Sequence, residues 1–387
     1  MSGIHPVYAA MAPTIFEHMS GLARTHGAIN LGQGFPDEAP PQDLIAAAVR
    51  AIAERSSQYP PAFGVPELRA EICRFYARRQ GLALTPDNVV VTSGATEALA
   101  ASILALVKPG DEVILFQPAY DSYAPMVRRA GGEPVSVRLH PPDWSYVAQD
   151  IERAITPRTR LLILNDPLNP AGKVASEAEL SMLADVCVRH DLIAICDEVW
   201  EDVRFDARPH RSLLSFPGMT ERAVKIGSAG KIFGLTGWKV GWFCAGNELA
   251  IAIGRAHQFL TFTTPPALQW AVAEGLARDE AAFAAQREGW ASSRAALATG
   301  LERAGFVVLQ SAATWFLCID LAASGIGLTD REFSERAVVE AGVASIPVSA
   351  LIEGQGPQHI LRLCFAKDIA LLDEAVARLA AFRDTLR

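Results

Sequence analysis

The sequence has few cysteines, and none of the six belongs to a C-x-x-C pair or stands at a spacing typical of metal ligands. They are Cys73, Cys187, Cys196, Cys244, Cys318 and Cys364. Several lie within apolar runs, where free thiols are commonly buried. The pattern predicts no metal site and favours a reducing, cytoplasmic location.

The chain also lacks a basic stripe, a signal peptide and a membrane-spanning run. Acidic residues outnumber basic ones by 43 to 35, which argues against a nucleic-acid partner. The first 20 residues mix His, Pro and Glu into their apolar positions, unlike a secretory signal. No apolar run reaches the roughly 20 residues that cross a bilayer. The composition therefore predicts a soluble globular protein with no membrane partner.

Short apolar runs alternate with helical patterns along the middle of the chain. The runs that predict strands are Asn88–Thr92, Glu112–Phe116, Pro134–Leu139, Leu161–Asn165, Leu192–Asp197, Ala223–Ile226 and Val240–Ala245. Amphipathic stretches between them, such as 96–107, 123–130 and 176–190, predict helices. This alternation is typical of an α/β fold, here a mostly parallel seven-stranded sheet between helices.

Residues 286–387 follow another pattern, with a long helix rich in Ala, Arg and Glu, scattered strands and a closing helix over 370–386. They predict a smaller α+β unit. The length of 387 residues suits one large and one small domain. We expect an N-terminal arm and part of the small domain over 1–44, a large domain over 45–285 and a small C-terminal domain over 286–387. No linker composition marks the joint near 285.

The most informative segment is SAGKIFGLTGWKVG, residues 228–241, which lies between two predicted strands. It places Lys231 in a turn of small residues and Lys239 eight positions later. Small neighbours let a bulky cofactor approach the backbone, and a lysine amine can form an imine with an aldehyde. Pyridoxal phosphate is held in this way. A surface turn with two solvated lysines explains this segment equally well when it is taken alone.

Polar residues follow several predicted strands, at the edge where α/β sheets bind ligands. Residues 93–97 open a helix, whose N-terminus can bind an anion. Asn169 lies in a turn made rigid by two prolines. Asp197 ends a buried strand, where a carboxylate needs a partner such as a cationic ring nitrogen. Helix caps and an ordinary strand–helix connection are the competing interpretations. No G-x-G-x-x-G follows a strand, which counts against a dinucleotide site.

One arginine, Arg362, stands inside an otherwise apolar predicted strand near the C-terminus. A buried arginine without a fixed anion is costly. A substrate carboxylate suits its planar guanidinium, and a structural salt bridge is the alternative.

Together these motifs resemble the class I aminotransferases of pyridoxal-phosphate fold type I, most closely the branch of methionine and kynurenine aminotransferases. The resemblance covers nearly the whole chain. The matching segments, in order, are Asn30–Asp37, Gln58-Tyr59, Phe63–Arg69, Thr92–Leu99, Tyr120–Pro125, Asn169-Pro170, Asp197–Val199, Ser228–Trp242 and Arg362–Lys367. Each segment is moderately specific, and their common order is what makes the resemblance strong.

The resemblance implies an enzyme that uses pyridoxal 5′-phosphate. Lys231 then carries the Schiff base, and Asp197 pairs with the pyridinium nitrogen so that the ring acts as an electron sink. Asn169 hydrogen-bonds the phenolic oxygen of the ring, and Tyr120 stacks on its face. The implied phosphate site consists of Ala95, Thr96, Ser228 and Lys239, with Tyr59 contributed by the neighbouring subunit of a homodimer with shared active sites.

The resemblance also implies the substrates, an amino acid and a 2-oxo acid that exchange an amino group in a ping-pong reaction. Gly34 and Arg362 are the implied contacts of the α-carboxylate, and Asn169 is a further implied substrate contact. The arm around Ile15 and Phe16, again from the partner subunit, is expected to line the side-chain pocket. The pocket candidates Phe16, Tyr120, Phe262 and Trp315 are aromatic. They favour Met, Phe, Tyr, Trp, Leu or kynurenine over acidic donors.

The chain departs from the family pattern at two places. Trp200 stands where the family usually has a tyrosine that donates to the phenolic oxygen. The indole is expected to pack against the edge of the cofactor ring without giving that hydrogen bond. The turn before Asn169 also has Asp166 and Leu168 in place of commoner residues.

Two other functions fit much of the same pattern. A carbon–sulfur β-lyase of the same fold uses the same lysine and aspartate, and releases pyruvate and ammonia without an amino acceptor. A non-catalytic, aminotransferase-like regulatory domain normally follows a DNA-binding domain, whereas this chain begins almost directly at the aminotransferase arm.

Overall fold

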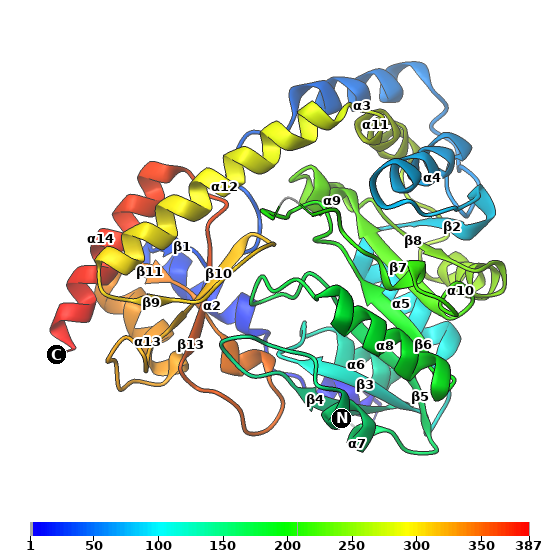
Figure 1. Cartoon of the computed structure of the whole chain (residues 1–387). Coiled ribbons are helices and arrows are strands. Elements are labelled where there is room, and N and C mark those ends of the chain that lie inside the picture. The colour runs from blue at the N-terminus through cyan, green and yellow to red at the C-terminus, as the bar shows by residue number, and fades with distance from the viewer. Residues whose placement is uncertain (1–2, 207, 387) are drawn as a thin grey trace.

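A seven-stranded sheet forms the centre of the larger part of the computed structural model, which describes residues 3–206 and 208–386 (Figure 1). Its strand order is β2-β8-β7-β6-β5-β3-β4. The strands are β2 (Val89–Thr92), β3 (Glu112–Gln117), β4 (Glu133–Arg138), β5 (Thr159–Asn165), β6 (Ile193–Asp197), β7 (Ala223–Ser228) and β8 (Gly241–Ala245). β8 runs antiparallel to both of its neighbours, and every other pair in this sheet is parallel. The predicted sheet and its seven strands are confirmed.

Helices cover both faces of this sheet, which explains why its inner strands are apolar on successive residues. Alternate residues enter two different cores: Ile195 packs on the face of α5 (Ala95–Leu106) and α6 (Tyr123–Arg129). Cys196 packs on the opposite face, with α4 (Pro66–Gln80) and α8 (Glu177–Arg189). This alternation turns Asp197, the next residue of β6, toward the face of α5 and α6.

A smaller antiparallel sheet, in the order β12-β13-β10-β9, lies in the C-terminal part of the chain. Its strands are β9 (Val307–Val308), β10 (Phe316–Asp320), β12 (Ile346–Pro347) and β13 (Ile360–Cys364). A separate parallel pair joins β1 (Ile29–Asn30) to β11 (Val343–Ala344). The N-terminal segment therefore lies against the C-terminal unit.

The longest helix, α12 (Glu280–Arg303), connects the two parts of the molecule and packs along the closing helix α14 (Ile369–Thr385) (Figure 1). It crosses residue 285, where the predicted boundary between the large and small domains lies, and the three-part division stays a prediction. The remaining α-helices are α1 (Pro6–Ala9), α2 (Ile15–His26), α3 (Gln42–Glu54), α7 (Ala148–Ala154), α9 (Ala229–Ile232), α10 (Asn247–Leu260), α11 (Pro266–Leu276) and α13 (Asp330–Arg336).

Local sequence signals fix where several helices start. The Thr14 hydroxyl accepts from the Glu17 N–H and starts α2, which ends at Gly27 in the left-handed conformation, φ 60°. Ser176 and Glu179 form a reciprocal capping box at the start of α8. These caps satisfy N–H groups that the first turn of a helix leaves without partners.

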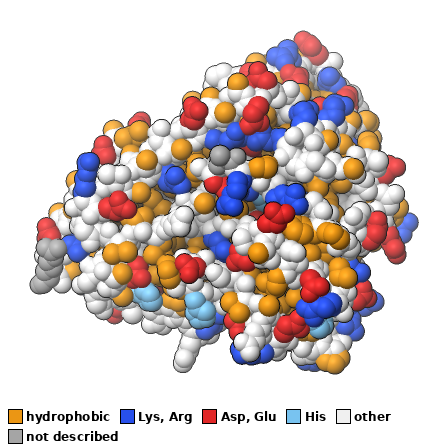
Figure 2. All heavy atoms as spheres, viewed as in Figure 1, with side chains coloured by type: hydrophobic (Ala, Val, Ile, Leu, Met, Phe, Trp, Pro, Cys, Tyr) orange, Lys and Arg blue, Asp and Glu red, His pale blue; other side chains and the backbone are white. Residues whose placement is uncertain are grey.

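The burial of the thiols and the mixed charges of the surface agree with what the composition predicts. All six cysteines are free and buried. On the face in Figure 2, Lys and Arg side chains lie among Asp and Glu side chains, so neither sign dominates this face. Within residues 3–206 and 208–386, no helix is both long enough and apolar enough to span a membrane.

Candidate active site

A cavity of about 550 Å³ lies at the carboxyl edge of the large sheet, and residues of both sheets line it. Twelve of the fourteen site residues predicted from the sequence form part of its wall. They are Phe16, Gly34, Ala95, Thr96, Tyr120, Asn169, Asp197, Trp200, Ser228, Lys231, Lys239 and Arg362. Residues from eight separate sequence segments thus meet in one site.

Lys231 lies on the short helix α9, directly after β7. Its Nζ atom is 4.8 Å from the ring centroid of Trp200 and 5.3 Å from that of Trp315. Burial lowers the pKa of the lysine to about 8. A substantial fraction of the amine is therefore neutral near physiological pH, as a nucleophile or a proton acceptor must be.

Asp197 is buried at the end of β6 and has one oxygen without a partner. Its Oδ2 accepts a hydrogen bond of 2.5 Å from the Tyr123 hydroxyl. Its Oδ1 is buried and has no hydrogen-bond partner in the described part of the chain. Burial raises the pKa of this carboxyl, while Tyr123 and Lys231 act to lower it. An N–H donor with positive charge, such as a pyridinium, fits this oxygen.

Tyr123 is a member of this site that the sequence analysis missed. The residue belongs to a family segment, but nothing in the sequence shows that its hydroxyl reaches Asp197, 74 positions away. The only sequence feature that could have indicated a buried role for Tyr123 is its place at the start of a short, partly apolar helix.

The N-terminus of α5 and Lys239 provide positive potential at one end of the cavity. Gly94 precedes α5 with φ 81°, and a Cβ atom there would lie 3.0 Å from the Nζ atom of Lys239. The missing side chain lets the ammonium approach the helix start, where Ala95 and Thr96 stand. Because exposed N–H groups, a helix dipole and an ammonium converge, the arrangement suits a phosphate. Ser228 lines the same cavity.

Arg362, on β13, carries a buried guanidinium with no carboxylate partner among the described residues. It donates to Oδ1 of Asn169 at 3.0 Å and to the carbonyl of Gly32, and no residue in 3–206 or 208–386 bonds to its Nε. Its Cζ lies 3.9 Å from the ring centroid of Phe316. Burial lowers the pKa of the guanidinium to about 10. The structure thus disfavours the salt-bridge alternative and leaves a cation that suits a carboxylate ligand.

Gly34 packs against Phe316 so closely that no side chain fits at position 34. A Cβ atom at this position would lie 2.5 Å from Cζ of Phe316, the ring on which Arg362 stacks. Any larger residue would displace that ring and the guanidinium with it.

Phe16 corrects one expectation. The sequence predicts that the arm around Ile15 and Phe16 comes from the partner subunit. Instead, Phe16 lines the cavity of its own chain, and its ring centroid is 5.0 Å from Cζ of its own Arg362. The arm can do this because α2, which begins at Ile15, packs against β11 and β12 of the same chain.

The other two of the fourteen, Tyr59 and Trp315, do not line the cavity, and neither does the pocket candidate Phe262. Tyr59 is 82% exposed and contacts Phe262, another pocket candidate, edge to face at 5.4 Å. Its predicted contact across a subunit interface stays a prediction. Trp315 is fully buried behind Trp200, with ring centroids 5.0 Å apart. Its neighbour Phe316 lines the cavity in its place.

Trp200 lines the cavity, and its predicted packing against the edge of the cofactor ring stays a prediction. Its buried ring contacts Trp315 and Phe316 edge to face, and the Lys231 amine lies over it. The predicted lack of a hydrogen bond from this indole to the cofactor stays a prediction.

The chain matches the family model of class I and II aminotransferases over residues 26–379. It is 43% identical over 386 residues to the probable N-succinyldiaminopimelate aminotransferase of Mycobacterium tuberculosis, a match covering 96% of this chain and 97% of that protein. It is 39% identical over 370 residues to methionine aminotransferase of Escherichia coli, covering 95% and 96%. It is also 34% identical over 385 residues to human kynurenine–oxoglutarate transaminase 1, covering 91% of each chain.

Solved structures agree with these relatives. The N-succinyldiaminopimelate aminotransferase of Mycobacterium tuberculosis superposes with a TM-score of 0.94 at 42% identity, covering 98% of this chain and all of that chain. A methionine aminotransferase of Escherichia coli gives 0.94 at 38% identity, covering 98% and 99%. The chain therefore belongs to the class I and II aminotransferases. It is an aminotransferase of pyridoxal-phosphate fold type I, and its cofactor is pyridoxal phosphate.

Replacing Lys231 by Ala should abolish turnover, and borohydride should attach the cofactor of the unmodified enzyme to the peptide that contains Lys231. The neutral amine attacks the aldehyde, so cofactor association should accelerate about tenfold per pH unit below pH 8 and level off above it. Stopped-flow absorbance measures the rate. Lys173, which pairs with Glu179 at 3.0 Å, is the control position for an alanine variant. Label on Lys173 or Lys239 would refute the assignment.

Replacing Tyr123 by Phe should weaken cofactor binding about tenfold or more, because a hydrogen bond to a buried carboxylate contributes about 1.5–3 kcal/mol. The pKa of Asp197 rises when this donor is lost, and the carboxylate then pairs less well with a cationic ring. Titration of the cofactor-free protein by absorbance gives the dissociation constant. Tyr146→Phe is the control, since Tyr146 is buried in the other core. Equal affinity of the two variants would contradict the role of Tyr123.

Proposed function

We propose that this enzyme moves the amino group of an apolar or aromatic amino acid to a 2-oxo acid by a ping-pong mechanism. The observation that carries the donor class is the wall of the cavity, where Phe16, Tyr120 and Phe316 lie around Arg362. Aromatic walls with one guanidinium suit an α-carboxylate attached to an apolar side chain. Methionine, phenylalanine, tyrosine, tryptophan, leucine and kynurenine are such donors.

Pyridoxal phosphate supplies an aldehyde and an electron-accepting ring when it is bound. Lys231 would hold the cofactor, and its amine, with a pKa of about 8, would accept and return the substrate proton. Asp197 would keep the ring nitrogen protonated. Arg362 holds the α-carboxylate, and Asn169 fixes the guanidinium through its Oδ1 atom. This fixation orients the substrate Cα toward the lysine.

The charges at the wall disfavour an acidic side chain close to the cofactor. Within the described residues, the cations of the cavity are Lys231, Lys239 and Arg362, and each has a proposed partner. Asp121 adds a carboxylate to the wall. It would repel a donor carboxylate placed nearby.

A second candidate donor is N-succinyldiaminopimelate, after which the relative that is 43% identical is named. An adjoining cavity of about 710 Å³ shares Thr14 and Asp121 with the first and includes Arg331 of α13. The Arg331 guanidinium forms no ion pair or hydrogen bond within the described part of the chain. A long donor with a distal carboxylate could pass Asp121 and bind there.

A donor panel decides between the two candidates. The proposal predicts that kcat/KM for methionine, phenylalanine or kynurenine exceeds that for N-succinyldiaminopimelate. It also predicts that Arg331→Ala changes kcat/KM for methionine less than twofold. A preference for the succinylated donor, reduced about tenfold or more by Arg331→Ala, would support the second candidate and overturn the first. Pyruvate and ammonia released without an amino acceptor would instead indicate the β-lyase.

We further propose a cytoplasmic homodimer in which Tyr59 completes the phosphate site of the partner subunit. The supporting observation is that Tyr59 is largely exposed and contacts Phe262, which is also exposed. Large aromatic side chains are enriched at subunit interfaces. The six buried free thiols agree with a reducing compartment.

Mixing two inactive variants tests the shared site. Tyr59→Ala should bind cofactor weakly in every site of its own homodimer, and Lys231→Ala should be inactive. A mixed dimer regains one complete site, with Lys231 from one subunit and Tyr59 from the other. Activity should therefore rise when the two variants are unfolded together and refolded as a mixture. A gel of differently tagged chains shows whether mixed dimers have formed. If they have, and the activity of the mixture only equals the sum of the two separate activities, the shared site is contradicted.

A further inference from the structure

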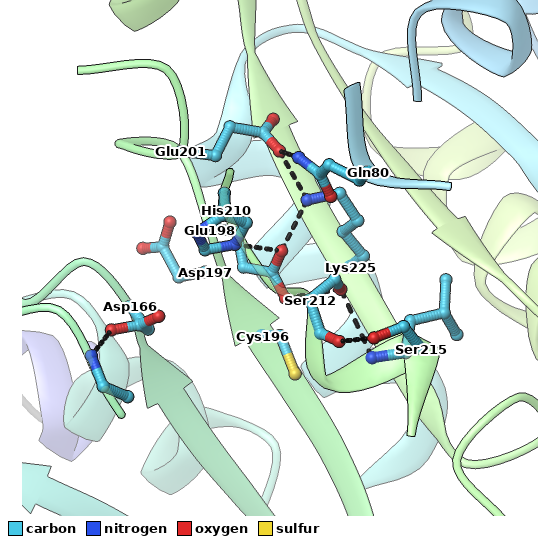
Figure 3. A network of polar contacts seen from close by, with 12 residues as sticks. Gln80, Asp166, Cys196, Asp197, Glu198, Glu201, His210, Ser212, Ser215 and Lys225 are labelled. Atoms are coloured by element: carbon cyan, nitrogen blue, oxygen red, sulfur yellow. Dashed lines mark hydrogen bonds and ion pairs between the residues drawn. The ribbon is translucent and has the colours of Figure 1, made fainter. Parts of the chain in front are cut away.

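A second group of buried charges lies directly behind Asp197, on the other face of the sheet (Figure 3). Its centre is Lys225 of β7, whose side chain is fully buried. The ammonium forms ion pairs with both Glu198 and Glu201. Neither carboxylate lines the cofactor cavity, and the proposed reaction uses none of these three residues.

Both carboxylates are held by further donors. Glu198 is 2.8 Å from His210 Nε2 and accepts from the Ser212 hydroxyl at 2.8 Å. Glu201 accepts from the Tyr76 hydroxyl at 2.7 Å and from the Gln80 amide at 2.6 Å. The group therefore joins α4, β7 and the loop after β6 through charge-assisted hydrogen bonds, which are stronger than neutral ones.

The segment 197–201 contributes residues to both sites. Asp197 and Trp200 line the cofactor cavity, whereas Glu198 and Glu201 bind Lys225. Figure 3 shows the Asp197 side chain directed away from the Lys225 group. In the sheet, Lys225 is paired with Cys196, the residue before Asp197, so its side chain stands on the opposite face from Asp197.

We propose that Lys225 is a positioning residue of the aminotransferase site. It binds the back of the segment 197–201 at two points, Glu198 and Glu201, and so fixes Asp197 and Trp200 at the cofactor. The proposal rests on the family's cofactor and is independent of which donor the enzyme uses.

The same geometry argues against a metal ion in this group. Carboxylate oxygens of Glu198 and Glu201 and a ring nitrogen of His210 lie within 4.8 Å of one another, as metal ligands could. However, the Lys225 ammonium already binds both carboxylates and would repel a second cation. Burial would raise the pKa of Glu198, but Lys225 and His210 lower it to about 2. The Lys225 ammonium therefore takes the position between the two carboxylates that a metal cation would occupy.

Stability alone does not explain these buried charges. Replacing a buried ion pair with apolar groups of similar volume is often neutral or stabilising, because desolvation offsets the attraction between the charges. A group that binds two points of one catalytic segment has a different use, which is to restrict the orientation of that segment.

The test removes the charges together, because Lys225→Met alone leaves two buried carboxylates without a counter-ion. The variant Lys225→Met/Glu198→Gln/Glu201→Gln should fold, but its dissociation constant for pyridoxal phosphate should rise about tenfold or more. The pH midpoint of the cofactor absorption band should also move upward. A misplaced Asp197 leaves less positive charge on the ring nitrogen, and less positive charge favours a proton on the Lys231 nitrogen.

Glu112→Gln is the matched control. Glu112 is a buried carboxylate that accepts from Thr156 and Thr159 and pairs with Arg158, at the amino end of β3, far along the sheet from the site. This variant should lower the melting temperature and leave the midpoint unchanged. A triple variant with the affinity and midpoint of the unmodified enzyme would overturn the proposal.

If the triple variant does not fold, Tyr76→Phe, which removes one donor to Glu201, should move the midpoint upward by a smaller amount. No shift in that variant would likewise overturn it.

Discussion

The buried carboxylate of Asp197 is the constraint on which the rest of this site depends. An ionised carboxylate that leaves water must be paired; Tyr123 donates to one oxygen of this one, and among the described residues the other oxygen has no hydrogen-bond partner. Burial accordingly raises its pKa. In the proposed reaction, the pyridinium of the cofactor would complete this pairing. Arg362, on the opposite wall, is incomplete in the same way and suits the substrate carboxylate.

Aromatic rings join these two charged groups across the two sheets. Trp200 follows the large sheet, and its ring contacts both Trp315 and Phe316 of the C-terminal unit. Phe316 in turn supports the Arg362 guanidinium. A shift of either sheet would therefore move the lysine and the arginine relative to each other. Such contacts can keep cofactor and substrate groups at a fixed separation, which is what an oriented reaction requires.

Much of the fold and site could be predicted from the sequence, because apolar runs and polar strand ends are local features. The seven strands form at the predicted apolar runs. Lys231, Asp197 and Arg362 line one cavity, as expected. The remainder depended on tertiary geometry. Trp315 and Phe316 differ by one position, and only the strand register decides which of them lines the cavity.

Long-range contacts explain the other differences. Whether Phe16 serves its own chain or a partner depends on where α2 packs, which no local pattern encodes. Tyr123 reaches Asp197, and Lys225 reaches Glu198, through pairings of distant segments. Which residues of the segment 197–201 face the cofactor cavity, and which bind Lys225, follows only from how both faces of the sheet are packed.

The central claim is that two incomplete polar groups divide the work, with Asp197 binding the cofactor and Arg362 binding the substrate. The most direct measurement is the half-reaction of cofactor-loaded Arg362→Ala with methionine, followed by the loss of the cofactor's visible band in a single turnover. The account predicts unchanged cofactor affinity, a half-reaction slowed by about two orders of magnitude or more, and a smaller loss in Arg362→Lys, which keeps the charge without the planar fork. A half-reaction of normal rate in Arg362→Ala would contradict it.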